Sequence, residues 1–179
     1  MLKKINLIPP TNSQSKMCDI FAEEMGDKES KFYRDKSEGN AGKVSLWAWG
    51  GKMAEVAVYN TLVASKRYKK ISQPEMLMHE VWMKSHDADI VADGKNIHIK
   101  SFIKYAQLDP TWLFSLTDKV VDRPTDDDIL ALVIYDKDKK FEAYFIPAKN
   151  VVNLYREPMS DKIKAKALYE KDLITSYPL

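Results

Sequence analysis

Runs of apolar residues divide the second half of the chain into short segments. Residues 128–136 (DILALVIYD) form a near-continuous apolar run, which is typical of a buried central strand. The polar turn 137–140 follows, and 141–147 (FEAYFIP) is its expected hairpin partner. Further strands are predicted at 88–92, 97–102 and 111–116.

Helical spacing dominates the rest of the chain. Met17, Ile20, Phe21 and Met25 share one face of a predicted helix. A second helix is expected from Lys52 to Lys66, after two glycines that we expect to break the structure. These glycines are Gly50 and Gly51. Residues 1–11 form an expected N-terminal arm, and 67–86 are ambiguous. Closing helices are expected at 148–155 and 160–174.

This order of helices, strands and helices predicts the fold class. It indicates an α/β (α+β) protein with a mixed central β-sheet flanked by helices. The length of 179 residues suits one domain, 1–179, in which 1–11 form an N-terminal arm.

Composition narrows the class of protein. Hydrophobic residues make up 45% of the chain and charged residues 30%, as in ordinary soluble proteins. The net charge is only +2, so binding of nucleic acid would require clustered positive charge. A single cysteine, Cys18, excludes an intramolecular disulfide, and no Cys/His spacing resembles a zinc site. The apolar stretch from Ile5 to Ile8 is too short for a signal peptide core or a membrane span, so we expect a cytoplasmic protein.

The segment 86–102 (HDADIVADGKNIHIKSF) predicts a hairpin with an unusual polar face. If the turn is centred on Gly94-Lys95, Asp89 lies opposite Lys100. Because side chains alternate, His98 shares the face of Lys100, while Ile90, Ile97 and Ile99 share the other face. Taken alone, this pattern is more typical of an exposed hairpin with an ordinary ion pair, which contributes little to stability.

A second carboxylate changes this interpretation. Glu55, Val58, Tyr59 and Leu62 form one helical stripe, so Glu55 is aligned with residues that face the core. A glutamate facing inward is costly unless it is paired or binds a metal. The alternative is a glutamate at the first turn of the helix, where the helix dipole stabilises a negative charge.

The two segments GGKMAEVAVYNTL and DIVADGKNIHIKS together resemble the PD-(D/E)xK nuclease superfamily. The resemblance covers roughly residues 50–105 and implies a restriction-endonuclease-like mixed sheet flanked by helices. It implies that Glu55 is the helix glutamate, Asp89 the metal-binding aspartate and Lys100 the catalytic lysine. His98 stands where that family has Glu or Asp, and Asp87 is the alternative metal ligand.

The resemblance also implies a chemistry. Glu55, Asp89 and the backbone carbonyl of Ile99 would bind Mg²⁺, with Mn²⁺ as a possible substitute. The metal would polarise the phosphate and activate water, while Lys100 orients the water or offsets developing charge. His98 would be a weak ligand, a hydrogen-bond partner of metal-bound water or a general base, or else a sign of lost activity.

Basic residues flank the expected site. We expect Lys66, Arg67, Lys69 and Lys70, together with Lys104 and Tyr105, to contact the DNA backbone. A solvated helix end is the more ordinary interpretation of the first four, because cations are favoured there. The acidic loop 122–128 would repel DNA, and we expect it to lie away from the cleft.

The resulting expectation is a Mg²⁺-dependent endodeoxyribonuclease of the type II restriction endonuclease kind, acting on double-stranded DNA as a homodimer. A junction resolvase or phage nuclease of the same fold is an alternative. A non-catalytic nucleic-acid-binding module, decayed at His98, belongs to another class, as does a structural protein in which Asp89 and Lys100 form a surface pair. The nuclease hypothesis requires Glu55 and Asp89 to lie close together.

Overall fold

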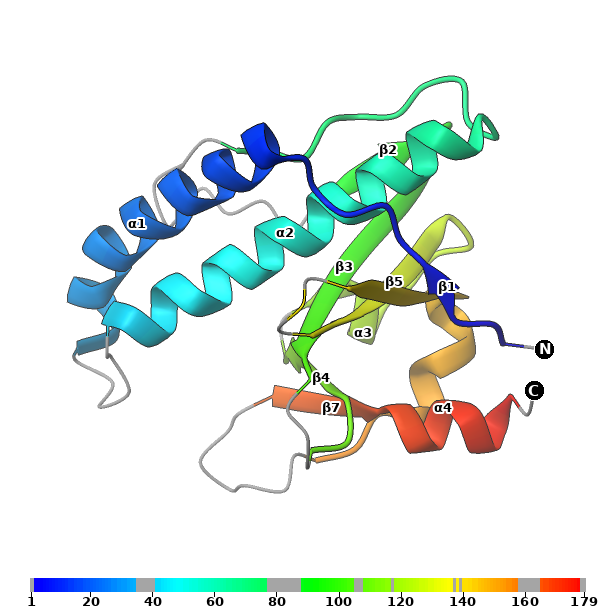
Figure 1. Ribbon diagram of the computed structural model, residues 1–179. Coiled ribbons are helices and arrows are strands. Elements are labelled where there is room, and N and C mark those ends of the chain that lie inside the picture. Colours follow the sequence, from blue (N-terminus) through cyan, green and yellow to red (C-terminus); the bar gives the residue numbers. More distant parts are fainter. Residues whose placement is uncertain are drawn as a thin grey trace.

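The computed structural model describes residues 2–34, 41–76, 88–104, 108–116, 118–136, 138, 140–157 and 165–177, with the backbone alone for 26–34 and 41–45. The strands are β1 (Ile5–Asn6), β2 (Ile90–Ala92), β3 (Lys95–Ile103), β4 (Thr111–Ser115), β5 (Asp128–Tyr135), β6 (Phe141–Pro147) and β7 (Ala165–Tyr169). The helices are α1 (Asn12–Arg34), α2 (Ala41–Ser65), α3 (Lys119–Asp122), α4 (Glu170–Ser176) and a 3-10 helix, η2 (Ala148–Leu154) (Figure 1).

A mixed sheet forms the centre of the protein. Its strand order is β1-β6-β5-β3-β2, and a separate two-stranded sheet pairs β4 with β7. Strands β3 and β5 run parallel, whereas the other neighbours in the main sheet are antiparallel. The continuous apolar run of β5 fits this central position, because both of its faces are covered. The predicted mixed α+β architecture is thus confirmed.

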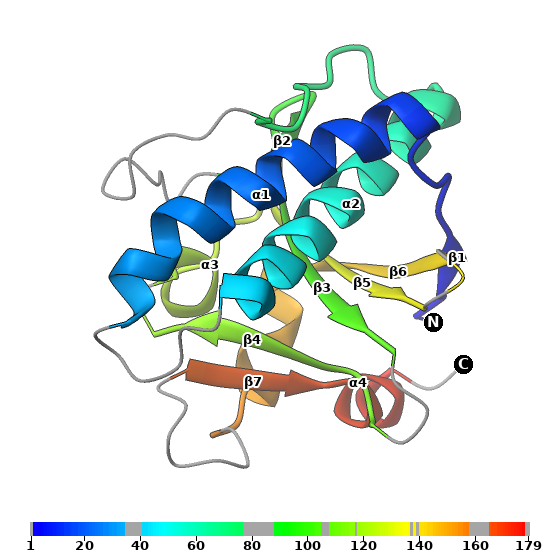
Figure 2. The same cartoon turned by 60° about the vertical axis from the view of Figure 1, so that its left-hand side comes forward.

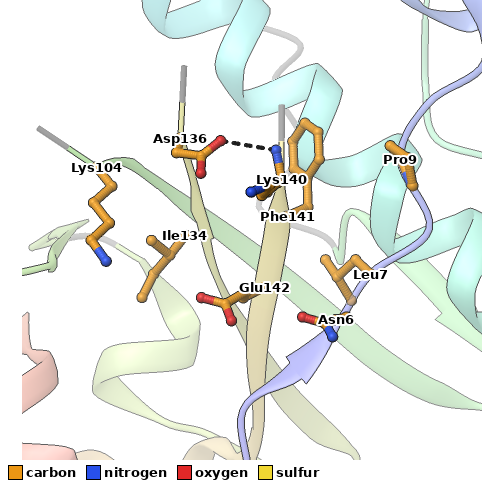
Figure 3. A pocket seen from close by; sticks show the side chains of 9 residues that line it. All are labelled: Asn6, Leu7, Pro9, Lys104, Ile134, Asp136, Lys140, Phe141 and Glu142. Atoms are coloured by element: carbon orange, nitrogen blue, oxygen red, sulfur yellow. Dashed lines mark hydrogen bonds between the residues drawn. The ribbon is translucent and has the colours of Figure 1, made fainter. Parts of the chain in front are cut away.

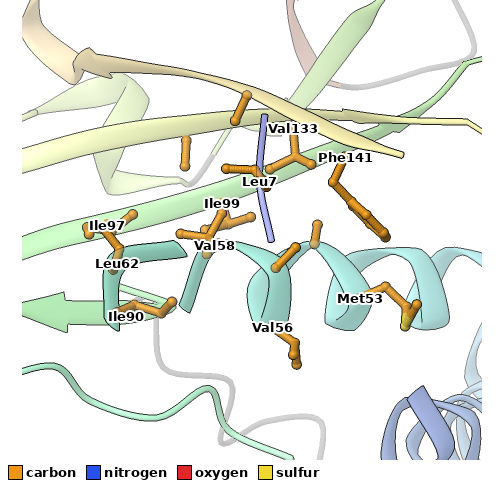
Figure 4. Packing of buried hydrophobic residues seen from close by; sticks show 14 of the residues in the cluster. Leu7, Met53, Val56, Val58, Leu62, Ile90, Ile97, Ile99, Val133 and Phe141 are labelled. Carbon is orange, nitrogen blue, oxygen red and sulfur yellow. The ribbon is translucent and has the colours of Figure 1, made fainter. Parts of the chain in front are cut away.

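Each face of the sheet has its own apolar core. On one face, α2 packs against β3 and β5 through residues such as Val58, Ile97 and Ile99 (Figure 4). On the other face, Phe114 of β4, Leu130 of β5 and Leu173 of α4 belong to the second cluster. Helix α1 lies against α2 on the outer side of the first core (Figure 2).

The hairpin β2–β3 has a different register from the predicted one. Ile90 pairs with Ile97 and Ala92 with Lys95, so the expected pairing of Asp89 with Lys100 is wrong by two residues. The turn is the two-residue Asp93-Gly94, with φ of 48° and 84°, as an Asp-Gly hairpin turn requires. A register shift of two residues leaves every side chain on the same face of the sheet. The predicted apolar face shared by Ile90, Ile97 and Ile99 is therefore confirmed.

The two adjacent glycines lie inside α2, and the prediction that they break the structure is wrong. A Cβ atom on Gly50 would lie 1.8 Å from the hydroxyl oxygen of Tyr135, whereas one on Gly51 would meet nothing within 4 Å. Gly50 therefore allows α2 to approach β5 closely. The helix begins eleven residues before the expected Lys52 because packing overrides the low helix propensity of glycine.

Two other expectations about helices are corrected. In α1, the buried residues include Cys18, Ala22 and Met25, whereas Met17 and Ile20 are half exposed, so the buried face is rotated from the predicted one. Near the C-terminus, the expected helix 160–174 contains strand β7 and then α4. Pairing with β4 holds 165–169 extended, which is a tertiary contact that local spacing does not encode.

Apart from the short helix α3, which was not predicted, the remaining elements agree with expectation to within two residues at each end. The arm 1–11 contributes the edge strand β1, which pairs with β6. The expected helix 148–155 is the 3-10 helix η2. None of the helices in the described part of the chain combines the length and apolar character that crossing a bilayer requires.

Candidate functional site

Glu55 projects from the inner side of α2. Its stripe neighbours Val58 and Leu62 are buried in the first core, as the spacing predicted. Only 13% of the Glu55 side chain is exposed. The helix begins at Ala41, so Glu55 is far from the first turn and its burial is not explained by the helix dipole.

Asp89 lies at the edge of the sheet, one residue before β2. Its Oδ2 accepts a hydrogen bond of 2.6 Å from the backbone N–H of Ile99. In a strand, the N–H and C=O of one residue point to the same side, so the Ile99 carbonyl also faces this edge. Asp89 therefore lies beside the backbone of the predicted metal-binding residue.

Burial raises the pKa of both carboxyl groups. Burial raises the pKa of Glu55 to about 7; Lys52 opposes the rise, and the negative charge of Asp89 adds to it. Burial also raises the pKa of Asp89, against the hydrogen bond from Ile99 and the charges of Lys100 and Lys52. Glu55 and Asp89 are therefore near enough for the charge of Asp89 to act on Glu55, in a largely desolvated neighbourhood that also contains the Lys52 ammonium.

Lys52 belongs to the same neighbourhood. Its Nζ lies 2.6 Å from Oε2 of Glu55, one turn along α2, and only 14% of its side chain is exposed. Lys52 was not among the predicted site residues. The i,i+3 spacing of Lys52 and Glu55 on a predicted helix is the signal that could have identified this pair.

His98 is bound on the opposite face of the sheet from the α2 core. Its Nε2 lies 3.2 Å from Oδ1 of Asp128, the first residue of β5. Asp128 also accepts hydrogen bonds from the backbone and hydroxyl of Thr125 and from the amide of Asn96. Although burial alone would raise the pKa of Asp128, these hydrogen bonds together lower it to about 2.

This contact corrects the interpretation of the acidic loop. Residues 122–128 were expected to lie away from the site, but Asp128 is buried and contacts His98. Asp127 and Asp126 bind Lys95 and Lys149. Two of the loop's carboxylates are therefore partly neutralised by lysines, and Asp128 is held by hydrogen bonds.

Lys100 also has a partner other than the predicted one. Its Nζ lies 3.0 Å from Oδ2 of Asp118 and 5.3 Å from the centre of the Phe114 ring. Asp118 also caps α3, because its Oδ1 accepts from the N–H of Val120. Lys100 nevertheless remains close enough to Asp89 to lower its pKa.

The oxygen atoms around Asp89 are of the type that a hard divalent cation prefers. Among the described residues, no group of three or more His, Cys, Asp or Glu is placed to hold a metal ion. Magnesium is commonly held by one or two carboxylates together with water and substrate phosphate. Glu55, Asp89 and the Ile99 carbonyl carry oxygen atoms of the kind that such a cation binds. The alternative ligand Asp87 and the predicted DNA contact Tyr105 lie outside the described residues.

Basic residues line the edge of the hairpin. Lys66, Arg67, Lys69 and Lys70 are exposed, and Lys66 directly follows α2 with a positive φ of 54°. The backbone N–H groups of Lys69 and Lys70 donate to the carboxylate of Asp93 in the turn. This anchors the segment 66–70, here called the basic segment, beside β2 and only a few residues along the sheet from Asp89.

Lys104 lies elsewhere, just beyond the other end of β3. It lines a cleft of about 420 Å³ formed by β1, β6 and the end of β5 (Figure 3). Asp136, Lys140 and Glu142 also line this cleft, so its charges are mixed. None of Glu55, Asp89, His98 or Lys100 borders the cleft, which therefore does not coincide with the predicted catalytic residues.

Comparisons with known families and curated proteins identify no relative of this chain.

Proposed function

We propose that this chain is a Mg²⁺-dependent endodeoxyribonuclease, of the type II restriction endonuclease kind. The observation that carries the proposal is that two largely desolvated carboxylates, Glu55 and Asp89, interact electrostatically, and that Asp89 is hydrogen-bonded to the backbone of Ile99. Buried carboxylates that are not fully compensated are costly, and they are retained where they perform chemistry.

Each residue has a defined role in this proposal. Glu55, Asp89 and the Ile99 carbonyl would hold Mg²⁺, which when bound supplies positive charge to the phosphate and acidifies its water. Lys100, on a flexible side chain, would exchange Asp118 for a phosphate oxygen and offset the charge that develops there. His98, with Nε2 directed to Asp128, keeps Nδ1 for a water molecule or a proton.

The basic segment supports DNA as the substrate. Its lysines and arginine are exposed and lie at the same sheet edge as Asp89. Contacts with phosphates provide affinity that does not depend on base sequence. Cutting both strands of a palindrome requires two active sites, so we propose that the enzyme acts as a homodimer.

A second candidate function is a nucleic-acid-binding module without catalysis. The observation that favours it is that His98 and Lys100 are both engaged, with Asp128 and Asp118 respectively. In that case the basic segment would bind DNA without metal, and removal of the Asp89 charge would leave or improve the affinity.

Cleavage assays separate the two functions. Purified protein is incubated with plasmid and phage DNA, with Mg²⁺ or with EDTA, beside Asp89→Ala and the exposed control Asp122→Ala. We expect discrete fragments from the wild type and the control only with Mg²⁺, and none from Asp89→Ala. A smear would indicate a nonspecific nuclease. No cleavage with Mg²⁺ or Mn²⁺, combined with metal-independent DNA binding, would reject the enzyme in favour of the binding module.

A further inference from the structure

Lys52 is a cation placed inside the proposed metal site. Its ammonium contacts Oε2 of Glu55 at 2.6 Å, and both side chains are largely buried. Its positive charge also acts on Asp89. Lys52 thus stabilises the negative charge of both carboxylates, whereas Lys100 acts on Asp89.

Electrostatics explain why a lysine lies there. Two carboxylates that share a buried site repel each other, and burial removes the water that would otherwise solvate them. A charge-assisted hydrogen bond from an ammonium offsets part of this cost. Lys52 can do this without distortion, because residues three apart on a helix lie on the same side.

Lys52 and a metal ion bound by Glu55 would compete for the same oxygen. Coordination of a divalent cation by Glu55 requires the carboxylate to give up contacts with other positive groups. The Lys52 ammonium has a second contact nearby, since it lies 4.9 Å from the centre of the aromatic ring of Phe21 on α1. This cation–π contact gives the ammonium a favourable place to stay when it leaves Glu55.

We propose that Lys52 is the internal counter-ion of the metal-free site and must leave Glu55 when a divalent cation binds, so that it sets the metal affinity. This inference rests on the proposed function, since it requires Glu55 to be a metal ligand. It adds a residue to the site that the family resemblance did not imply. Lys52 weakens metal binding and stabilises the protein while the metal is absent.

Calorimetry with the metal alone tests this role. Mg²⁺, and Mn²⁺ as a second probe, are titrated at a fixed, mildly alkaline pH into the wild type, Lys52→Met and Lys52→Arg. We expect Lys52→Met to bind the metal roughly 10- to 100-fold more tightly, because a charge-assisted hydrogen bond no longer has to be broken. Lys52→Arg keeps the charge and should stay close to the wild type.

Thermal unfolding supplies a second readout and a matched control. In EDTA, Lys52→Met should unfold at a lower temperature than the wild type, and Mg²⁺ should raise its midpoint more than that of the wild type. The control Lys171→Met removes another lysine that lies over an aromatic ring, that of Tyr169, and should change neither metal affinity nor its effect on stability. If Lys52→Met does not fold, Lys52→Gln removes the charge and keeps a hydrogen-bond donor.

The outcomes distinguish the two proposals. If the wild type binds Mg²⁺ and the neutral variants bind it equally or less tightly, Lys52 has only a structural role and the inference is overturned while the nuclease proposal stands. If neither the wild type nor any Lys52 variant binds Mg²⁺ or Mn²⁺, the metal-dependent function fails, and the role of Lys52 fails with it.

Discussion

The carboxylate of Asp89 accepts a hydrogen bond of 2.6 Å from the backbone N–H of Ile99. This contact joins the start of β2 to the middle of β3 beyond the last pair of the hairpin, Ile90 with Ile97. Asp89 therefore has a structural role as well as its proposed chemical one, and substitutions can separate the two roles.

Asp89→Asn and Asp89→Ala should differ in stability but not in activity. The amide oxygen of asparagine can still accept from Ile99, whereas alanine leaves that N–H without its partner, at a cost of about 1–3 kcal/mol. Both variants should lose Mg²⁺-dependent cleavage. Urea unfolding measures the stability difference; equal stability of the two variants would show that the hydrogen bond contributes nothing.

The stability of the protein should depend on pH through Glu55. Burial raises the pKa of Glu55 from 4.5 to about 7 in the folded state, so the folded protein binds the proton more tightly than the unfolded chain does. The stability gained from this proton is fully present below about pH 4.5 and is lost as the pH rises through about 7. The loss corresponds to about 3 kcal/mol.

Glu55→Gln tests this linkage. The variant lacks the titrating group, so its stability relative to the wild type should increase as the pH rises from about 5 to about 8, by up to about 3 kcal/mol. Denaturant unfolding at several pH values measures the difference. A difference that stays constant with pH would mean that Glu55 has an ordinary pKa in the folded protein.

Gly50 and Gly51 should respond in opposite ways to alanine. A Cβ on Gly50 would overlap the hydroxyl of Tyr135, which is buried and packed against Phe141, so Gly50→Ala should destabilise by about 1–3 kcal/mol. Gly51 faces open space, and Gly51→Ala should stabilise α2 by about 0.5–1 kcal/mol. Thermal or urea unfolding of the two variants compares them directly; similar effects would contradict the close approach of α2 to β5.

The basic segment should govern DNA affinity more than Lys104 does. Substitution of both Lys69 and Lys70 by Glu should weaken DNA binding. It should also make the slope of log affinity against log salt concentration shallower, by the equivalent of about two phosphate contacts. Lys104→Glu is the matched control, because Lys104 lies at the other end of β3 among Asp136 and Glu142. Fluorescence anisotropy across a range of salt concentrations measures both; an equal loss from Lys104→Glu would place DNA along the whole of β3.

The site was only partly predictable from the sequence. The alternation of apolar residues placed Ile90, Ile97 and Ile99 on one face, and helical spacing placed Glu55 toward the core; both predictions are confirmed. The partners of His98 and Lys100 were not predicted. Asp128 and Asp118 lie 30 and 18 positions away along the chain, and no local pattern relates them to β3.

The register of the hairpin was also not predictable from neighbouring residues alone. Asp93 and Gly94 marked a turn, but the sequence did not fix its centre, which was expected at Gly94-Lys95 and lies at Asp93-Gly94. The segment that follows α2 helps to select the observed turn, since Asp93 accepts from the N–H groups of Lys69 and Lys70. Turn type was thus decided by a contact with residues more than twenty positions away.

By itself, the sequence determined which segments are apolar, which side chains share a face and where a turn is favoured, because these depend on neighbours within a few residues. Only the tertiary structure decided that α2 continues through Gly50, that 165–169 are a strand, and that Lys52 lies against Glu55 in a buried neighbourhood with Asp89. Packing and electrostatics act through space, so the energies that settle these features come from residues that the chain brings together only when it folds.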